Sequence, residues 1–229
     1  MSKSSKRMAV NRESIDSNQH YSLDEAISLL KKTSNAKFNE TIDIAINLGI
    51  DAKKSDQNVR GSMVLPNGTG KTLRVIVFAQ SEQVDAAKNA GADKVGFEDL
   101  AEEIKSGFSE FDVVIATPDT MRIVGQLGKI LGPKGMMPNP KDGTVTKNVE
   151  DAVIKAKTGQ IRFRNDKGGV VHCPIGKIDF SEESIKENLE SLLGAIMKSK
   201  PSSVKGAFIK KVTVSSTMGP GITIDHSTI

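Results

Sequence analysis

The hydrophobic pattern changes twice along this chain of 229 residues and separates its ends from its middle. Ile42, Ile44 and Ile46 alternate with more polar or smaller residues, which predicts a strand with one buried face. The segments 73–79 and 111–116 are instead almost continuously apolar, as in parallel strands covered on both faces. The ends therefore predict α+β structure, and the middle predicts an α/β sheet.

The simplest architecture places both chain ends in one domain and inserts a second domain between them. We expect residues 1–66 and 160–229 to form a discontinuous α+β domain, and residues 67–159 to form a Rossmann-like, three-layer α/β domain. The fold class is thus α/β with two domains. Glycines lie at both crossings, with a proline at the first, which predicts rotation there. The predicted hinge residues are Pro66, Gly68, Gly70 and Gly159.

Residues 65–72, Leu-Pro-Asn-Gly-Thr-Gly-Lys-Thr, nearly match a nucleotide-binding P-loop. The last three residues fit the motif, but Leu65 stands where its first glycine belongs. Pro66 has no N–H to offer to a phosphate. A strand rather than a helix is predicted to follow. A flexible link between domains is the preferred interpretation, and a nucleotide-dependent enzyme is the alternative hypothesis.

Charge is distributed unevenly, although the net charge is only +4. Residues 1–66 carry +2, residues 67–159 carry −1 and residues 160–229 carry +3. Because phosphate neutralisation needs Lys and Arg, the two ends favour a polyanionic partner. Ordinary surface charge explains the same distribution, so charge alone does not decide between them.

Several other classes of protein are disfavoured. The single cysteine, Cys173, excludes an internal disulfide and is best explained as a small buried hydrophobe. His172 beside it would point to the opposite face of a strand, so the two do not form a nucleophile–base pair. No His or Cys pair has metal-ligand spacing, and no apolar run approaches about 20 residues. We expect no catalytic residue, metal, cofactor or membrane segment.

Basic residues near turns are candidate RNA contacts. Phe38 follows a lysine at the start of a strand, where an exposed ring could stack on a base. Arg162 and Arg164 share one face of a predicted hairpin over residues 161–173, and Lys167 lies in its turn. A core position for Phe38 and a solvated strand face for the basic residues are the plainer explanations.

Two glycine-rich segments are further candidates. Residues 215–221, Ser-Ser-Thr-Met-Gly-Pro-Gly, follow the last predicted strand and offer short donors to phosphate and 2′-OH groups. Residues 125–140 combine four glycines with two lysines, so they are either a nucleic-acid contact or an ordinary surface loop. A general nucleic-acid chaperone that uses such basic loops is a third hypothesis.

Six stretches of the chain resemble, in the same order, the bacterial family of large-subunit ribosomal protein one, found on the mobile ribosomal stalk beside the tRNA exit site. They are Lys37–Thr41, Ser55–Gly61, Leu65–Lys71, Gly128–Gly135 with Met137–Pro140, Phe163–Lys167 and Ser216–Pro220. The resemblance implies two α/β-type domains, the first built from both chain ends and the second inserted.

The resemblance also implies a function. The family's first domain carries the main contact to large-subunit (23S) ribosomal RNA. By similarity, we expect a cytoplasmic, ribosome-bound protein, monomeric when free, that assists release of deacylated exit-site tRNA and represses translation of its own operon mRNA through the messenger leader. The predicted RNA-binding residues are Lys37, Phe38, Thr41, Arg164, Lys167, Ser216, Thr217, Met218 and Gly219.

Overall fold

The computed structural model describes residues 6–16, 19–80 and 82–225. The chain divides into two compact units: Met1–Gly70 with Ile161–Ile229, and Lys71–Gln160. The sequence-based boundaries, after residues 66 and 159, lie close to these divisions. The divisions therefore fall beside Gly70 and Gly159, two of the predicted hinge residues.

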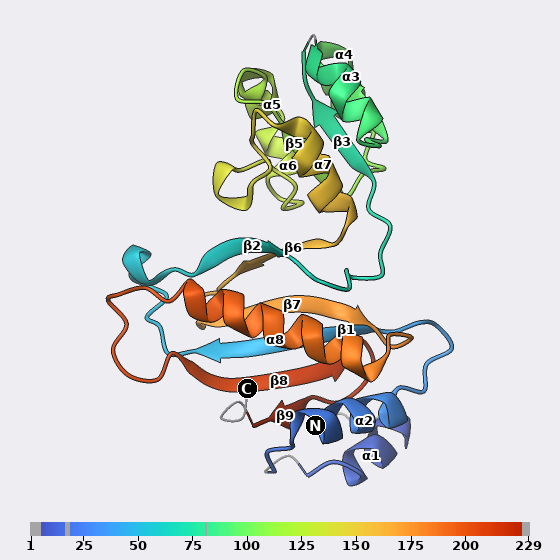
Figure 1. Ribbon diagram of the computed structural model, residues 1–229, viewed down its shortest axis with the longest axis vertical. Coiled ribbons are helices and arrows are strands. Elements are labelled where there is room, and N and C mark those ends of the chain that lie inside the picture. The colour runs from blue at the N-terminus through green and yellow to red at the C-terminus, as the bar shows by residue number, and fades with distance from the viewer. Residues whose placement is uncertain (1–5, 17–18, 81, 226–229) are drawn as a thin grey trace. The chain divides into compact units, whose positions relative to one another are not determined.

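The first unit contains a four-stranded sheet in the order β7-β1-β8-β9 and a two-stranded sheet of β2 and β6. In the larger sheet, the central strand β1 is antiparallel to both neighbours (Figure 1). The elements of this unit are α1 (Lys6–Glu13), α2 (Leu23–Thr33), β1 (Thr41–Leu48), β2 (Arg60–Val64), β6 (Gln160–Arg164), β7 (Val170–Lys177), α8 (Glu182–Lys198), β8 (Ile209–Ser216) and β9 (Ile222–Ile224).

Local sequence signals account for the main elements of this unit. The isoleucines of β1 are buried at alternate positions, as the period-two pattern predicted. Ser22 and Glu25 form the capping box that begins α2, and the Ser181 hydroxyl accepts from the Ser184 N–H at the start of α8. The apolar faces of both helices join the sheet in one hydrophobic core.

The predicted hairpin over residues 161–173 is wrong in its pairing. β6 pairs with β2, whereas β7 pairs with β1, and only an isolated bridge joins Asn165 to Val171. The buried ring of Phe163 lies directly against Gly61 of β2, where an added Cβ would lie 2.7 Å from the ring. Because Gly61 has no side chain, the Phe163 ring can pack closely on β2. This contact accounts for the pairing of β6 with β2 rather than with β7.

The second unit contains a parallel sheet in the order β4-β3-β5. Separate hydrophobic clusters cover its two faces, so the predicted parallel α/β sheet is confirmed. The glycine-rich segment over residues 125–140, for which an ordinary surface loop was one interpretation, includes the short helix α6 and the end of α5. The elements are β3 (Val75–Phe78), α3 (Glu82–Asn89), β4 (Lys94–Gly96), α4 (Glu98–Lys105), β5 (Val113–Ala116), α5 (Met121–Gln126), α6 (Gly128–Leu131) and α7 (Val149–Lys157).

The first crossing is anchored for most of its length, unlike the flexible link predicted at Pro66 and Gly68. Asn188, fully buried in α8, accepts from the Asn67 N–H at 3.0 Å and donates to the Gly68 carbonyl at 3.1 Å. Gly70 has a φ of +70° and packs against Phe180. Because these contacts hold residues 67–70 to the first unit, free rotation can begin only after Gly70.

We expect Asn188→Ala to destabilise the first unit by about 2–4 kcal/mol. The substitution leaves the part-buried Asn67 N–H and Gly68 carbonyl, and the buried Ile175 carbonyl, without their partner. Tyr21 is the only tyrosine, the chain has no tryptophan, and the ring is buried in this unit, so its fluorescence in urea reports the transition. Glu187→Ala removes an exposed contact to Asn67 and is the control, with an expected change of about 0.5 kcal/mol. Equal stability of the two variants would contradict the anchoring role.

Candidate nucleic-acid interface

The start of β1 and the end of β8 lie side by side, although they are about 175 residues apart in sequence. The Thr217 N–H donates to the Thr41 carbonyl, and the Thr41 N–H donates to the Thr217 hydroxyl, both at 3.0 Å. Phe38 is 53% exposed and Met218 is 46% exposed. We call the set formed by Phe38, Thr41, Thr217, Met218 and Gly219 the strand-end surface.

A buried carboxylate lies beneath this surface and ties its two segments together. Glu40 is 1% exposed, and one of its carboxylate oxygens accepts from the Met218 N–H at 2.9 Å. The other oxygen accepts from the Ser34 hydroxyl at 2.8 Å and from the Ala36 N–H at 3.2 Å. The turn after β8 therefore has its position fixed by a residue that precedes β1.

Burial raises the pKa of Glu40, but hydrogen bonds oppose that effect. The donors are the Met218 N–H, the Ser34 hydroxyl and the Ala36 N–H. Together they outweigh burial, so the pKa of Glu40 lies below its ordinary value. The carboxylate is thus ionised at neutral pH and holds the turn by charge-assisted hydrogen bonds.

Ser216 differs from the other predicted contacts. Ser216 is only 4% exposed, so its hydroxyl lies inside the first unit rather than on the strand-end surface. Position 216 pairs with Ile42 and has the same inward orientation in the sheet. At Gly219, an added Cβ would lie 2.5 Å from the Ser216 oxygen. A glycine there lets the turn pass closely over Ser216.

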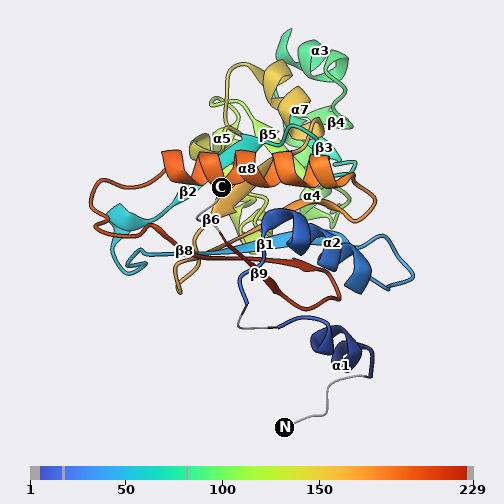
Figure 2. The same ribbon diagram turned by 60° about the horizontal axis from the view of Figure 1, so that its bottom comes forward.

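Helix α1 contributes a residue to this surface that the sequence interpretation missed. The Asn11 side chain of α1 is buried and donates to the Thr33 carbonyl at 2.9 Å, so the helix is tied to the first unit. Figure 2 shows α1 near the turn between β8 and β9. The Arg7 guanidinium donates to the Met218 carbonyl at 3.3 Å, which places a cation at the edge of the strand-end surface.

Arg164 and Lys167 lie at the other end of β1. Thr41 pairs with Lys177, whereas Asn47 pairs with Val170, which follows the turn containing Lys167. Six residues of strand separate the two ends by about 20 Å. Arg164 and Lys167 line a hollow of about 480 Å³ together with Asn58. The structure thus separates these two cations from the strand-end surface, with which they were predicted to act.

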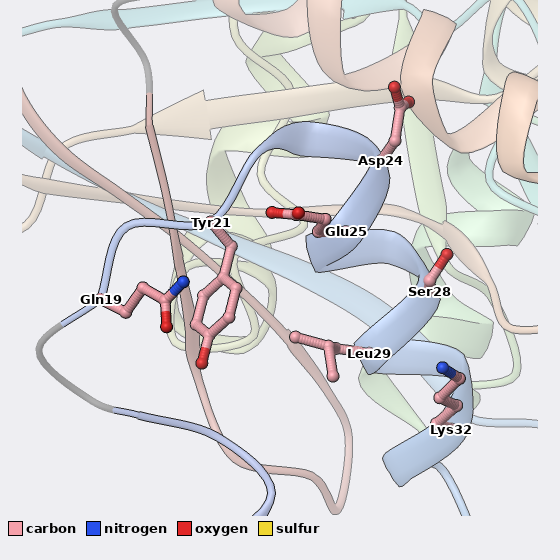
Figure 3. Close-up of a pocket in the computed structure, with 7 residues that line it drawn as sticks. All are labelled: Gln19, Tyr21, Asp24, Glu25, Ser28, Leu29 and Lys32. Atoms are coloured by element: carbon pink, nitrogen blue, oxygen red, sulfur yellow. The ribbon is translucent and has the colours of Figure 1, made fainter.

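A second hollow, of about 450 Å³, lies beside α2 and is lined by the side chains drawn in Figure 3. Its polar groups already have structural roles. The Glu25 carboxylate accepts from the Ser22 N–H, and the Tyr21 hydroxyl accepts from the Asp16 N–H at 2.8 Å. None of the residues predicted to bind RNA lines this hollow. We therefore assign it no part in the candidate interface.

The features that resembled enzyme sites have structural explanations. The P-loop-like segment leads into β3, whereas a P-loop needs a helix after it. Cys173 is buried, as predicted, and burial, with Asp43 nearby, raises the pKa of its thiol to about 12. His172 points outward on the other face of β7. Among the described residues, no three His, Cys, Asp or Glu side chains gather as metal ligands, and no helix is long and apolar enough to cross a membrane.

Known proteins align with this chain over its whole length. A sequence model of the Ribosomal protein L1p/L10e family matches residues 30–220. "Large ribosomal subunit protein uL1" of Vibrio vulnificus (strain YJ016) is 61% identical over all 229 residues, which cover 98% of that relative. The protein of the same name from Tolumonas auensis (strain DSM 9187 / NBRC 110442 / TA 4) matches with the same identity and coverage.

The fold and the interface define a two-unit α/β protein with an exposed strand-end surface rather than a catalytic centre. The chain belongs to the Ribosomal protein L1p/L10e family. Its homologues are structural components of the ribosome, so this chain is a ribosomal protein and not an enzyme.

Replacing Glu40 by Gln should destabilise the first unit by about 1–3 kcal/mol at pH 7. The amide keeps the shape of the side chain but loses the charge that the donors around it stabilise. Because the folded-state pKa is lowered, the stability due to the carboxylate is complete above the ordinary value of 4.5 and declines as the pH falls below it. The difference between wild type and Glu40→Gln should therefore narrow below about pH 4.5.

Tyr21 fluorescence in urea at a series of pH values measures this difference. Glu190→Gln, on the exposed side of α8, is the control and should change stability by less than about 0.5 kcal/mol at every pH. A Glu40→Gln deficit that is absent at pH 7, or that stays constant as the pH falls below 4.5, would show that Glu40 does not hold the turn as a carboxylate.

Proposed function

We propose that the strand-end surface binds large-subunit (23S) ribosomal RNA at the mobile stalk near the exit site. Family membership makes the chain a structural constituent of the large ribosomal subunit. The observation that carries the proposal is the exposure of Phe38 and Met218, held together in one unit by Glu40. Large apolar side chains exposed on an ordered surface are typical of binding sites.

The chemistry of the surface suits folded RNA better than a short peptide or a small molecule. The Phe38 ring can stack on a base or ribose, and Met218 offers an adaptable apolar contact. Thr217 and the backbone of Gly219 present small polar groups that fit the shape of RNA and its 2′-OH groups. Lys37 and Arg7 add charge at the edge of the surface. Four phosphate contacts would give a log–log salt slope of about −3 to −4.

Arg164 and Lys167 lie apart from the strand-end surface, at the other end of β1. They reach the same RNA only if it extends about 20 Å along β1 from the strand-end surface. We propose that the chain bends between the units at two places, just after Gly70 and at Gly159. Gly159 has a φ of +103°. This bending would let the units follow the stalk while the first unit keeps hold of its RNA.

The finer roles rest on the resemblance to the family. We propose that the protein assists release of deacylated tRNA from the exit site and represses its own operon mRNA, whose leader would imitate the ribosomal RNA site. In this proposal it acts in the cytoplasm on the ribosome and is a monomer when free. Repression and ribosomal binding use the same strand-end surface, so one substitution there should weaken both.

Met218→Asp should weaken binding to a stalk RNA fragment at least tenfold, because it places a negative charge among RNA phosphates. Met197→Asp is a matched control, since Met197 is 51% exposed on α8 of the same unit and its change of charge is the same. The control should stay within twofold of wild type in an anisotropy titration. Tyr21 fluorescence checks that both variants fold.

Two results would count against the proposed function. Unchanged affinity in Met218→Asp would remove the strand-end surface from the interface. Equal affinity of the wild-type protein for stalk RNA and for unrelated RNA at physiological salt would favour a general nucleic-acid chaperone instead. A reporter translated from the protein's own leader should escape repression by Met218→Asp but not by Met197→Asp.

A further inference from the structure

The second unit contains a strongly basic segment that the proposed function does not use. Residues 120–147 hold five Lys and Arg and one Asp, a net charge of +4. The rest of Lys71–Gln160 holds seven Lys and Arg and twelve Asp and Glu, a net charge of −5. We call residues 120–147 the basic segment. The unit has a net negative charge outside the basic segment and a net positive charge within it, so the electrostatic potential there is expected to be positive.

The five cations of the basic segment are all exposed. In the part of the chain that the structure describes, no carboxylate forms an ion pair with any of them, whereas Lys94 and Lys157 elsewhere in the unit pair with Glu103 and Asp93. The five are Arg122, Lys129, Lys134, Lys141 and Lys147. Side chains of this kind keep their full charge for an external anion.

The basic segment is an ordered part of the fold rather than a loose loop. Val124, Leu127 and Leu131 are fully buried in the core on one face of the sheet, and Met136 and Met137 pack against the same core. Apolar side chains therefore fix the backbone on the inner side while the cations stay on the outer side. This arrangement favours a defined binding surface over the non-specific contacts of a flexible basic loop.

The position of the basic segment in the sheet also favours a binding role. It leaves the carboxyl end of β5 and returns there, since the Ala116 N–H donates to the Thr144 carbonyl at 2.9 Å. The Thr120 hydroxyl donates to the Phe78 carbonyl at the end of β3. In the strand order β4-β3-β5, the chain changes direction between β3 and β5. Ligands of open α/β sheets bind beyond the carboxyl ends of strands at such a point.

Two glycines leave the backbone of the basic segment uncovered. Gly125 and Gly128 lie in α5 and at the start of α6, and an added Cβ at either would meet nothing within 4 Å. Because glycine weakens a helix and the fold gives no steric reason for it here, the absence of side chains points to close approach by a partner. A phosphate backbone is a partner that suits both bare backbone and cations.

We infer that the basic segment is a second RNA-binding surface, which contacts the phosphate backbone of a structured RNA. The inference rests on the proposed function, because that function supplies two RNA sources. One is the stalk RNA beyond the part bound by the strand-end surface, and the other is deacylated tRNA. Exposed Lys and Arg bind either RNA through its backbone, without sequence-specific base contacts.

The test uses the full chain and two double variants with equal changes of charge. Lys129→Gln with Lys134→Gln removes two cations of the basic segment. Lys88→Gln with Lys155→Gln removes two exposed cations from α3 and α7 of the same unit and is the matched control. One arm titrates a stalk RNA fragment. The other adds a fluorescent deacylated tRNA transcript to the complex with stalk RNA, and to free protein, over a range of salt concentrations.

The basic-segment variant should bind one of the two RNAs at least tenfold more weakly than wild type, with a log–log salt slope reduced by about two. The control should stay within twofold. The arm that responds identifies the RNA. Equal losses in both double variants, or no loss in either arm, would overturn the inference, and the latter result would favour an acidic protein as the partner. If wild type fails to bind stalk RNA, the proposed function fails, while the tRNA arm on free protein still tests the basic segment.

Discussion

The carboxylate of Glu40 is the interaction on which the arrangement of the first unit's interface depends. It joins the loop after α2 to the turn after β8, and no other described side chain bonds to both. The charged group is buried, so its hydrogen bonds must compensate for the water it has lost. The loop after α2 and the turn after β8, which are distant in sequence, are thereby held in one geometry, so the backbone of the strand-end surface is ordered in the free protein.

This order has consequences for binding. Phe38 and Met218 are exposed, yet Glu40 bonds to the loop that precedes Phe38 and to the Met218 N–H, and β1 pairs with β8 beside them. Preorganised side chains lose little freedom on binding, so more of the contact energy is available for affinity. Asn188 likewise fixes the backbone at the first crossing between the units, because its hydrogen bonds keep residues 67 and 68 with the first unit. The interface can then stay unchanged wherever the second unit lies.

The sequence predicted the features that depend on local patterns. The alternating isoleucines predicted β1, and the continuous apolar runs predicted β3 and β5. Contacts between distant segments were harder to predict. Helix α1 has no apolar stripe and depends on Asn11 and Arg7, and β2 lacks a regular burial pattern. The pairing of β6 with β2 depends on Phe163 meeting Gly61, which neither local sequence reveals.

The predicted interface residues followed from a family resemblance, which pointed to neither Glu40 nor Arg7. Glu40 is in phase with Ile42, Ile44 and Ile46, so the strand pattern already placed its side chain on the buried face. A charged residue at such a position predicts a hydrogen-bonded carboxylate. Ser216 is likewise in phase with Val212 and Val214, so the pattern of β8 places its side chain on the buried face.

The central claim is that both chain ends present one continuous RNA-binding surface. Photoreactive phenylalanine derivatives placed singly at Phe38 and at Met218 of the full chain, and cross-linked to stalk RNA, test it most directly. The account predicts that both positions cross-link to nucleotides of the same folded RNA element. Cross-links to separate elements, or a cross-link from only one of the two positions, would contradict it.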